Sequence, residues 1–158
     1  MSNLKMLRMG MNLTLNQMSN LTGIKIGTLG GYERERRRLL GARFSNLIKM
    51  CLVVNCGIGD IIEDDDVRNR FMMVCDNPRR LIVCDRGRIH ELRIRSKKSQ
   101  EECAEMMGTY QANYSAMEKR KAENMKFENV LKLCEVFDCS PLDMIDDDVM
   151  RSALRRVI

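Results

Sequence analysis

One short stretch in the second half of the chain carries side chains suited to hydrogen bonding with the edges of nucleic-acid bases. It reads "MMGTYQANYSAMEK" and begins at Met106. A helix fits the major groove of DNA, where a Gln side chain can pair with adenine through two hydrogen bonds. Small side chains beside it would allow close approach, so Gln111 is the best candidate for reading a base. The candidate base-reading residues are Tyr110, Gln111, Ala112, Asn113 and Ala116.

Basic residues lie on both sides of this stretch and could bind the phosphate backbone. Contacts to phosphate supply affinity without reading sequence. For any single one of these cations the alternative is a solvated charged surface, but their clustering around the turn favours DNA. The expected phosphate contacts are Lys97, Lys98, Thr109, Lys119, Arg120 and Lys121.

Two predicted helices position these side chains. Ser99 stands three residues before Glu102, the spacing of a capping box that begins a helix. Gly108 suits the end of that helix, and Thr109 is expected to cap the next one, which runs to about Met117. The candidate base-reading residues therefore fall on the first turns of the second helix.

Three further helices complete a small bundle around this pair. Apolar residues at helical spacing predict one that begins near Ile89 and another from Phe127 to Phe137. Ser140 and Pro141 begin a short fifth helix, because proline is preorganised for a first helical turn. Five short helices fit one bundle.

The order and spacing of these motifs resemble the lambda-repressor-like, Cro-type (XRE) family of helix-turn-helix DNA-binding proteins. The resemblance covers about residues 89 to 145 and, more weakly, 4 to 62. It implies that Gln111, Ala112 and Ala116 face bases and that Gln100 binds a backbone phosphate. It also implies structural salt bridges, which would be Arg93 with Glu118 and Arg8 with Glu33. The segment "EKRKAEN" lacks the glycine and proline usual in the family, which leaves the course of that loop open.

The chain also aligns with itself. A shift of 85 residues pairs Gly23 with Gly108 and Glu33 with Glu118. Further on the shift is 83, and "FSNLIKMCLVVNCGIGDIIEDD" matches "FENVLKLCEVFDCSPLDMIDDD", with Phe, Asn, Lys, Cys, Val, Asp and Ile in register. A tandem duplication of roughly 60 residues explains this recurrence.

The first copy lacks the side chains that read bases. Its corresponding stretch, "LTGIKIGTLGGYERERRR", has no G-x-x-x-x-G-K-[ST] pattern and so does not predict a nucleotide-binding loop. Ile26, Gly27 and Gly31 replace the base-facing residues, and Leu15 replaces Gln100. Nonspecific backbone contacts and a protein contact both remain open. The residues available for nonspecific contact are Lys25, Thr28, Arg34, Arg36, Arg37 and Arg38.

Composition limits the other classes of function. The chain has 158 residues, a formal charge of +5, 44% hydrophobic residues and only 4% aromatic residues, which favours a helical globular protein. No apolar run is long enough to span a membrane, and we expect a cytoplasmic location. The seven cysteines include C-x4-C pairs at positions that call for core, so buried thiols are expected rather than a metal site. We expect no catalytic residues, metal or cofactor, because the sole histidine has no evident partner.

Between the copies, "MMVC" and "LIVC" flank Asp76-Asn77-Pro78 and predict a β-hairpin. The expected fold is mainly α, with two tandem five-helix bundles joined by this hairpin-like linker. The expected segments are a degenerate helix-turn-helix domain (1–66), a basic linker (67–88), a DNA-binding helix-turn-helix domain (89–148) and a tail that forms a helix or a strand and could supply a dimer surface (149–158).

These features predict a sequence-specific regulator that binds double-stranded DNA, with a phage or mobile-element repressor implied by the resemblance. A homodimer is expected, since one competent reading helix needs a twofold partner to recognise a palindrome. The alternative is a protein-binding inhibitor or adaptor that reuses the fold, for example a phage anti-CRISPR or anti-defence protein with autoregulation. The glycine-rich helix and the many methionines favour that alternative.

Overall fold

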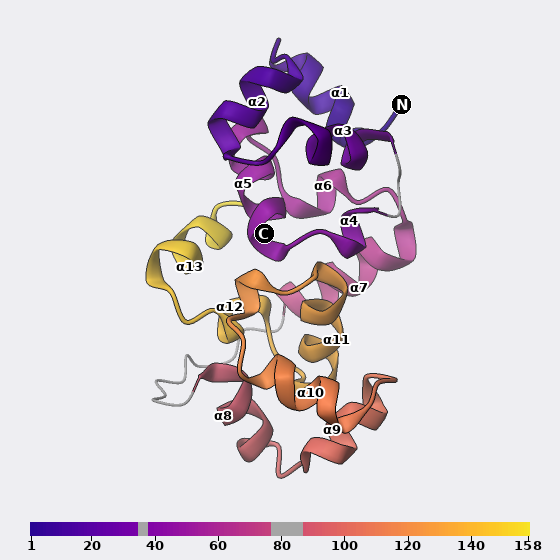
Figure 1. The fold of residues 1–158 in the computed structure, drawn as a ribbon, viewed down its shortest axis with the longest axis vertical. Coiled ribbons are helices and arrows are strands. Elements are labelled where there is room, and N and C mark those ends of the chain that lie inside the picture. Colours follow the sequence, from indigo (N-terminus) through magenta and orange to yellow (C-terminus); the bar gives the residue numbers. More distant parts are fainter. Residues whose placement is uncertain (35–37, 77–86) are drawn as a thin grey trace.

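The protein is described here by a computed structural model, which covers residues 1–34, 38–76 and 87–158 (Figure 1). Every regular element in these ranges is a helix. The first half contains α1 (Asn3–Gly10), α2 (Leu15–Thr22), α3 (Ile26–Arg34), α4 (Arg38–Gly41), α5 (Phe44–Val54), α6 (Ile58–Ile61) and α7 (Asp65–Cys75). The second contains α8 (Arg88–Arg95), α9 (Gln100–Met106), α10 (Gln111–Glu118), a 3-10 turn η1 (Ala122–Asn124), α11 (Phe127–Phe137), α12 (Pro141–Met144) and α13 (Asp148–Arg155).

Local side chains explain where helices α2 and α9 begin. The hydroxyl of Thr14 accepts from the backbone N–H of Gln17 at the start of α2, and Ser99 accepts from Glu102 N–H at the start of α9. In each case the third residue reaches back to the cap, which completes a capping box. The capping box predicted at Ser99 is confirmed.

The same unusual backbone conformations recur in both halves. Asn12 and Lys97 each have φ 54°, and the glycines that follow α2 and α9, Gly23 and Gly108, have φ 69° and 66°. These left-handed conformations tightly constrain the path of a chain. The turns on either side of α2 and α9 therefore have the same geometry, 85 residues apart.

The two halves meet through a short reciprocal contact. Arg43 and Lys126 form an isolated antiparallel bridge. Next to it, Phe44 N–H donates to Met125 O and Phe127 N–H donates to Ala42 O, both at 2.8 Å. The rings of Phe44 and Phe127 stack with centroids 5.8 Å apart and planes 9° from parallel. One hydrophobic core is thereby continuous through the joint.

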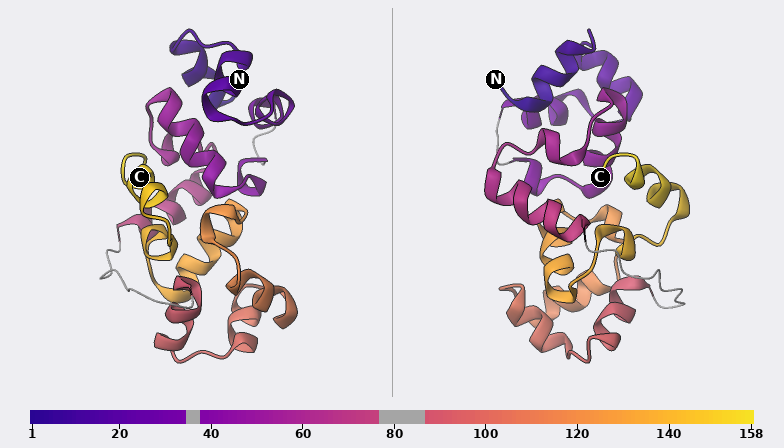
Figure 2. Two further views of the ribbon diagram at one scale, coloured as in Figure 1. Left: turned by 60° about the vertical axis from the view of Figure 1, so that its left-hand side comes forward. Right: turned by 180° about the vertical axis from the view of Figure 1, so that it is seen from behind.

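Helices α7 and α13 each cross to the opposite half. The ring of Phe71 on α7 meets Phe127 of α11 edge-on, with centroids 5.4 Å apart, and Arg70 on α7 pairs with Glu135 on α11 at 2.6 Å. In the other direction α13 packs on α5, and Ile58 N–H donates to Val157 O at 2.6 Å. The rear view in Figure 2 shows α7 lying across the junction.

In both crossing helices an arginine makes the same two contacts, one to a backbone carbonyl and one to an aspartate. Arg68 of α7 donates to the carbonyl of Ile62 and pairs with Asp65, and Arg151 of α13 donates to the carbonyl of Ile145 and pairs with Asp148. Asp64 and Asp147 cap the two helices. Each carboxylate accepts from a backbone N–H in the first turn of its helix, which would otherwise lack a partner.

The β-hairpin expectation is wrong where the structure tests it. Met72–Cys75, the expected first strand, forms the last turn of α7. A four-residue apolar run fits either structure, and the Asp64 cap together with the packing of Phe71 on α11 selects the helix. Asp76, the first residue of the expected turn, is the C-cap of α7, and the rest of that turn and the second strand lie outside the described residues. Of the two forms considered for the tail, α13 is the one observed, and in the described ranges no helix is long and apolar enough to cross a membrane.

Candidate nucleic-acid interface

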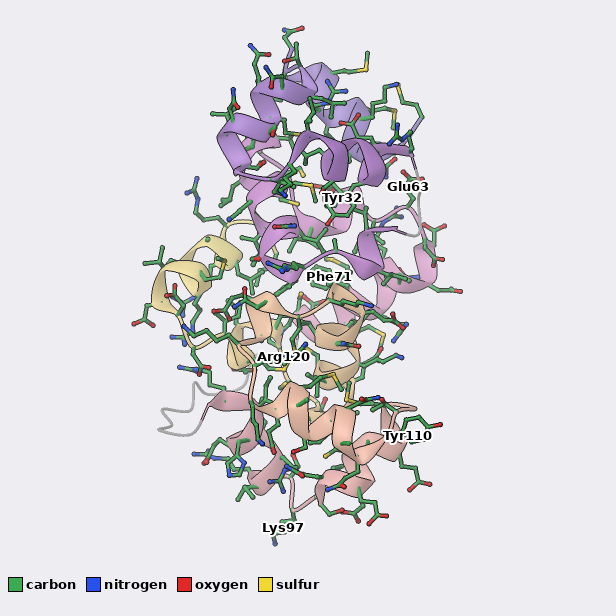
Figure 3. The ribbon with its side chains drawn as sticks, in the orientation of Figure 1. Tyr32, Glu63, Phe71, Lys97, Tyr110 and Arg120 are labelled. Carbon is green, nitrogen blue, oxygen red and sulfur yellow. The ribbon has the colours of Figure 1, made fainter. Side chains whose placement is uncertain are left out.

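Helix α10 buries one side and exposes the side that carries the candidate base-reading residues. Tyr114, Met117 and Glu118 are buried, whereas all of the candidate base-reading residues are exposed. Tyr110, just before the helix, is 82% exposed and projects outward in Figure 3. The exposed candidates are Gln111, Ala112, Asn113 and Ala116. They form one polar and small surface on the first two turns of the helix.

Gln111 is oriented by a relay of carboxamides. Its Nε2 donates to Oε1 of Gln100 at 3.3 Å, and Nε2 of Gln100 donates to Oε2 of Glu118 at 2.5 Å. Gln100 is the first residue of α9. This relay leaves Oε1 and the second N–H of Gln111 available for an external partner.

Glu118 on α10 contacts side chains from both α8 and α9 and so links three helices. Its Oε1 lies 2.6 Å from Nε of Arg93 on α8 and 3.4 Å from Nδ1 of His90. Arg93 also donates to the carbonyl of Lys98 at 3.1 Å, which holds the loop between α8 and α9. A buried carboxylate needs such compensation. The ion pair therefore sets the position of α10 relative to α8 and α9.

The first half contains the corresponding ion pair. Nε of Arg8 lies 2.6 Å from Oε1 of Glu33, and its Nη2 donates to Oε2 at 3.0 Å. Arg8 also donates to the carbonyl of Leu13 in the loop between α1 and α2. This pair is closed off from water slightly more than Arg93 with Glu118.

Thr109 does not cap α10. The N-cap is Tyr110, which makes no side-chain cap bond, and the Thr109 hydroxyl instead accepts from Nδ2 of Asn113 at 3.2 Å. The backbone N–H of Thr109 donates to the carbonyl of Ala104. The residue is therefore held by the turn that follows α9, and the helix begins one residue later than a Thr109 cap would place it.

A polar groove of about 390 Å³ runs beside α10. Its lining includes Asn113 and Ala116 from α10, and also Asn129 and Lys132 from α11. The sequence interpretation did not select these two α11 residues. The sequence did contain a signal, because Asn129 and Lys132 recur as Asn46 and Lys49 in the first half. Packing of the core does not explain why polar residues recur on the exposed side of a helix. The full lining is Met107, Gly108, Thr109, Asn113, Ala116, Met117, Arg120, Glu128, Asn129 and Lys132.

The expected phosphate-binding cations approach α10 from two sides. Lys97 lies at the tip of the α8–α9 loop, at one end of the molecule, and Arg120 lies nearer its middle, at the end of α10 (Figure 3). Lys98 is half-buried, and Lys119 and Lys121 are exposed. The structure places all five around the helix pair without bringing them into one cluster.

The corresponding residues of the first half lie at both ends of α3. Lys25 and Thr28 are exposed at its start and Arg34 at its end. Ile26, in place of Gln111, is 49% exposed. Arg36 and Arg37 lie outside the described residues, and Arg38 is described only as the first residue of α4.

Four of the cysteines that the structure describes lie in the interior, and Cys56 and Cys75 are half-buried. Cys51, Cys103, Cys134 and Cys139 are buried, and burial raises the pKa of Cys134 well above its ordinary value. Burial also raises the pKa of Cys75 to about 12. Across the described ranges no group of three or more His, Cys, Asp or Glu residues is arranged to hold a metal ion.

The second half of the chain matches a known family of domains. Residues 88–148 match the Cro/C1-type HTH DNA-binding domain. The Cro/C1-type domain spans α8 to α12, with α9 and α10 as its helix-turn-helix, and it agrees with the resemblance predicted over residues 89 to 145. The match does not extend to residues 4–62, so a second helix-turn-helix domain there stays a prediction. No curated protein and no solved structure matches the chain.

Proposed function

We propose that the chain is a sequence-specific regulator of transcription that binds double-stranded DNA through α10, and that it acts in the cytoplasm as a repressor from a phage or mobile element. The observation that carries the DNA-reading role is the exposed Gln111 amide, held by Gln100 on the first turn of α10. It lies in the helix that follows the turn of a Cro/C1-type domain.

In this proposal the two carboxamides have distinct roles. The free Oε1 and second N–H of Gln111 match the N6–H donor and N7 acceptor of adenine in the major groove. Gln100 uses one N–H for Glu118, so its other N–H can donate to a phosphate. Ala112 and Ala116 allow the helix to lie close to the bases and can contact a thymine methyl group.

Selection of binding sequences from random duplexes tests this function. We expect one preferred sequence, and we expect Gln111→Ala to reduce discrimination at one base pair by about 1–3 kcal/mol. Asn69→Ala, which removes an exposed amide on α7, is the matched control and should bind like the wild type. Failure to select any sequence, together with binding that does not depend on salt, would contradict the proposal.

The expected homodimer belongs to the same proposal. A regulator with one base-reading helix per chain recognises a palindrome when two copies bind. Light scattering with and without the selected duplex measures the stoichiometry. Two chains per palindromic duplex would support the dimer, and one chain per duplex would contradict it.

A protein-binding inhibitor or adaptor is the second candidate, and the surface of α1 favours it. Met6, Met9 and Met11 are 47%, 50% and 48% exposed. Exposed methionines are common on surfaces that bind proteins. Met6→Glu with Met9→Glu should leave binding to the selected duplex unchanged if α1 serves a protein target, and a loss of DNA binding would assign α1 to the DNA instead.

A further inference from the structure

The joint between the two halves is self-complementary. A shift of 83 residues turns Arg43 into Lys126, and it turns the bond from Phe44 N–H to Met125 O into the bond from Phe127 N–H to Ala42 O. The stacked rings are exchanged in the same way. A contact in which residue i meets j and j meets i is the mark of a twofold interface between identical subunits. Here such an interface forms within one chain.

The crossing helices show the same reciprocity. Helix α7 packs on α11, and α13 packs on α5, the helix that corresponds to α11. Both crossing helices are held by an arginine that donates to the carbonyl six residues before it. The arrangement is therefore that of a dimer with exchanged final helices, built from a single polypeptide.

This arrangement presents α3 and α10 together. The two helices lie on the same face of the molecule, near opposite ends of its long axis (Figure 1). The side view in Figure 2 places both on one side and α13 on the other. In twofold complexes of helix-turn-helix proteins, the reading helices are presented to successive turns of the same duplex face.

We propose that α2 and α3 form a second DNA-contacting surface, which holds the phosphate backbone next to the half-site that α10 reads. This inference rests on the proposed DNA-binding function. The surface offers the ammonium of Lys25, the hydroxyl of Thr28 and the guanidinium of Arg34, all exposed. Within the ranges that the structure describes, neither cation has an acidic partner.

The same surface does not read bases. Ile26 stands where α10 has Gln111, and an aliphatic side chain has no hydrogen-bonding group for a base edge. Phosphate contacts position a protein on a duplex but carry no sequence information. Each chain then covers one specific half-site and a nonspecific stretch about one helical turn away, roughly 34 Å, and in the proposed dimer each of the two chains does so.

A salt-series binding assay on the full-length chain tests the second surface. The double variant Lys25→Ala with Arg34→Ala is compared with Arg155→Ala with Arg156→Ala, which removes two exposed cations at the end of α13, off the α3–α10 face. On the selected duplex the first variant should lower the slope of log K against log salt by about 2. It should weaken every sequence equally, and the control should change neither quantity.

A duplex with neutral methylphosphonate linkages beside the α10 half-site locates the contact. On this duplex the wild type should fall to the affinity of the Lys25→Ala, Arg34→Ala variant, and that variant should lose nothing more. The proposed location would be overturned if the double variant bound more weakly than the wild type by the same factor on the charged and the neutral duplex. An unchanged salt slope with an intact Gln111→Ala effect would refute only the second surface, whereas loss of both effects would refute the DNA-binding function itself.

Discussion

At the scale of single residues, the proposed base reading depends on Gln111, a side chain that Gln100 holds in place. Gln100 touches Gln111 and Glu118, so one residue links the external contact to the buried ion pair. Because the amide of Gln111 already donates to Gln100, we expect less conformational entropy to be lost if it binds a base. Leu15, the residue in the place of Gln100 in the first half, cannot do this.

Gln100→Leu should weaken binding to the selected duplex by more than it weakens binding to random DNA. Removing the support of Gln111 and a phosphate contact should cost about 0.5–1.5 kcal/mol for each hydrogen bond lost. A double-mutant cycle with Gln111→Ala measures the coupling. Additive losses would show that Gln100 does not orient Gln111.

Gly27 gives a second residue-scale prediction, with Gly23 as its control. A Cβ at Gly27 would meet no heavy atom within 4 Å, and its helical backbone suits alanine. Gly27→Ala should therefore stabilise the protein by about 0.4–1 kcal/mol in urea unfolding. Gly23 has φ 69°, so Gly23→Ala should destabilise it.

The same Gly27→Ala variant addresses why α3 contains glycine. Internal packing does not require it, and we infer that a close external partner favours the glycine there. We expect weaker DNA binding by the more stable variant. Unchanged binding would mean that nothing approaches α3 closely at Gly27.

At the scale of elements, each half relies on a buried arginine–glutamate pair to set the angle of its third helix. Arg93 with Glu118 joins α8 to α10, and Arg8 with Glu33 joins α1 to α3. Each arginine also bonds a loop carbonyl five residues ahead. In each half these contacts therefore tie the two helices to the loop that follows the first of them.

Arg93→Ala should lower the free energy of unfolding by about 3–5 kcal/mol, because it leaves the buried carboxylate of Glu118 without its main compensation. Arg95→Ala, which breaks an exposed pair with Glu91, should cost at most about 1 kcal/mol. Urea unfolding followed by circular dichroism compares the two. Similar losses would show that the Arg93 pair is not effectively buried.

At the scale of the whole molecule, the halves share one core rather than touching through surface residues. Phe127 stacks on Phe44 and meets Phe71, and all three are essentially inaccessible. The exchanged helices α7 and α13 extend the shared surface. A joint of this kind favours cooperative unfolding of both halves.

Phe127→Ala should therefore destabilise both halves together, by about 3–5 kcal/mol. Tyr110→Ala, at an exposed aromatic residue, should change stability by less than about 0.5 kcal/mol. Native-state hydrogen exchange reports each half separately. If only α8 to α12 lost protection, the halves would be independent folding units.

The sequence by itself determined most of the local elements of the second half, because their signals are local. Ser99 with Glu102 marks the start of α9, Pro141 marks α12, and the apolar stripe of α11 gives Phe127–Phe137 with both ends correct. The pairing of Arg8 with Glu33 was expected only by resemblance, and its 2.6 Å contact needed the structure.

Only the tertiary structure decided how these elements combine. Met72–Cys75 has no periodicity that separates strand from helix, and the packing of Phe71, one residue earlier, against Phe127 of the other half settled the helix. Asn129 and Lys132 join the groove beside α10 only because α11 lies there. The reciprocal joint depends on contacts between residues more than eighty positions apart, which propensity and spacing cannot reveal, since they report on neighbours in the chain.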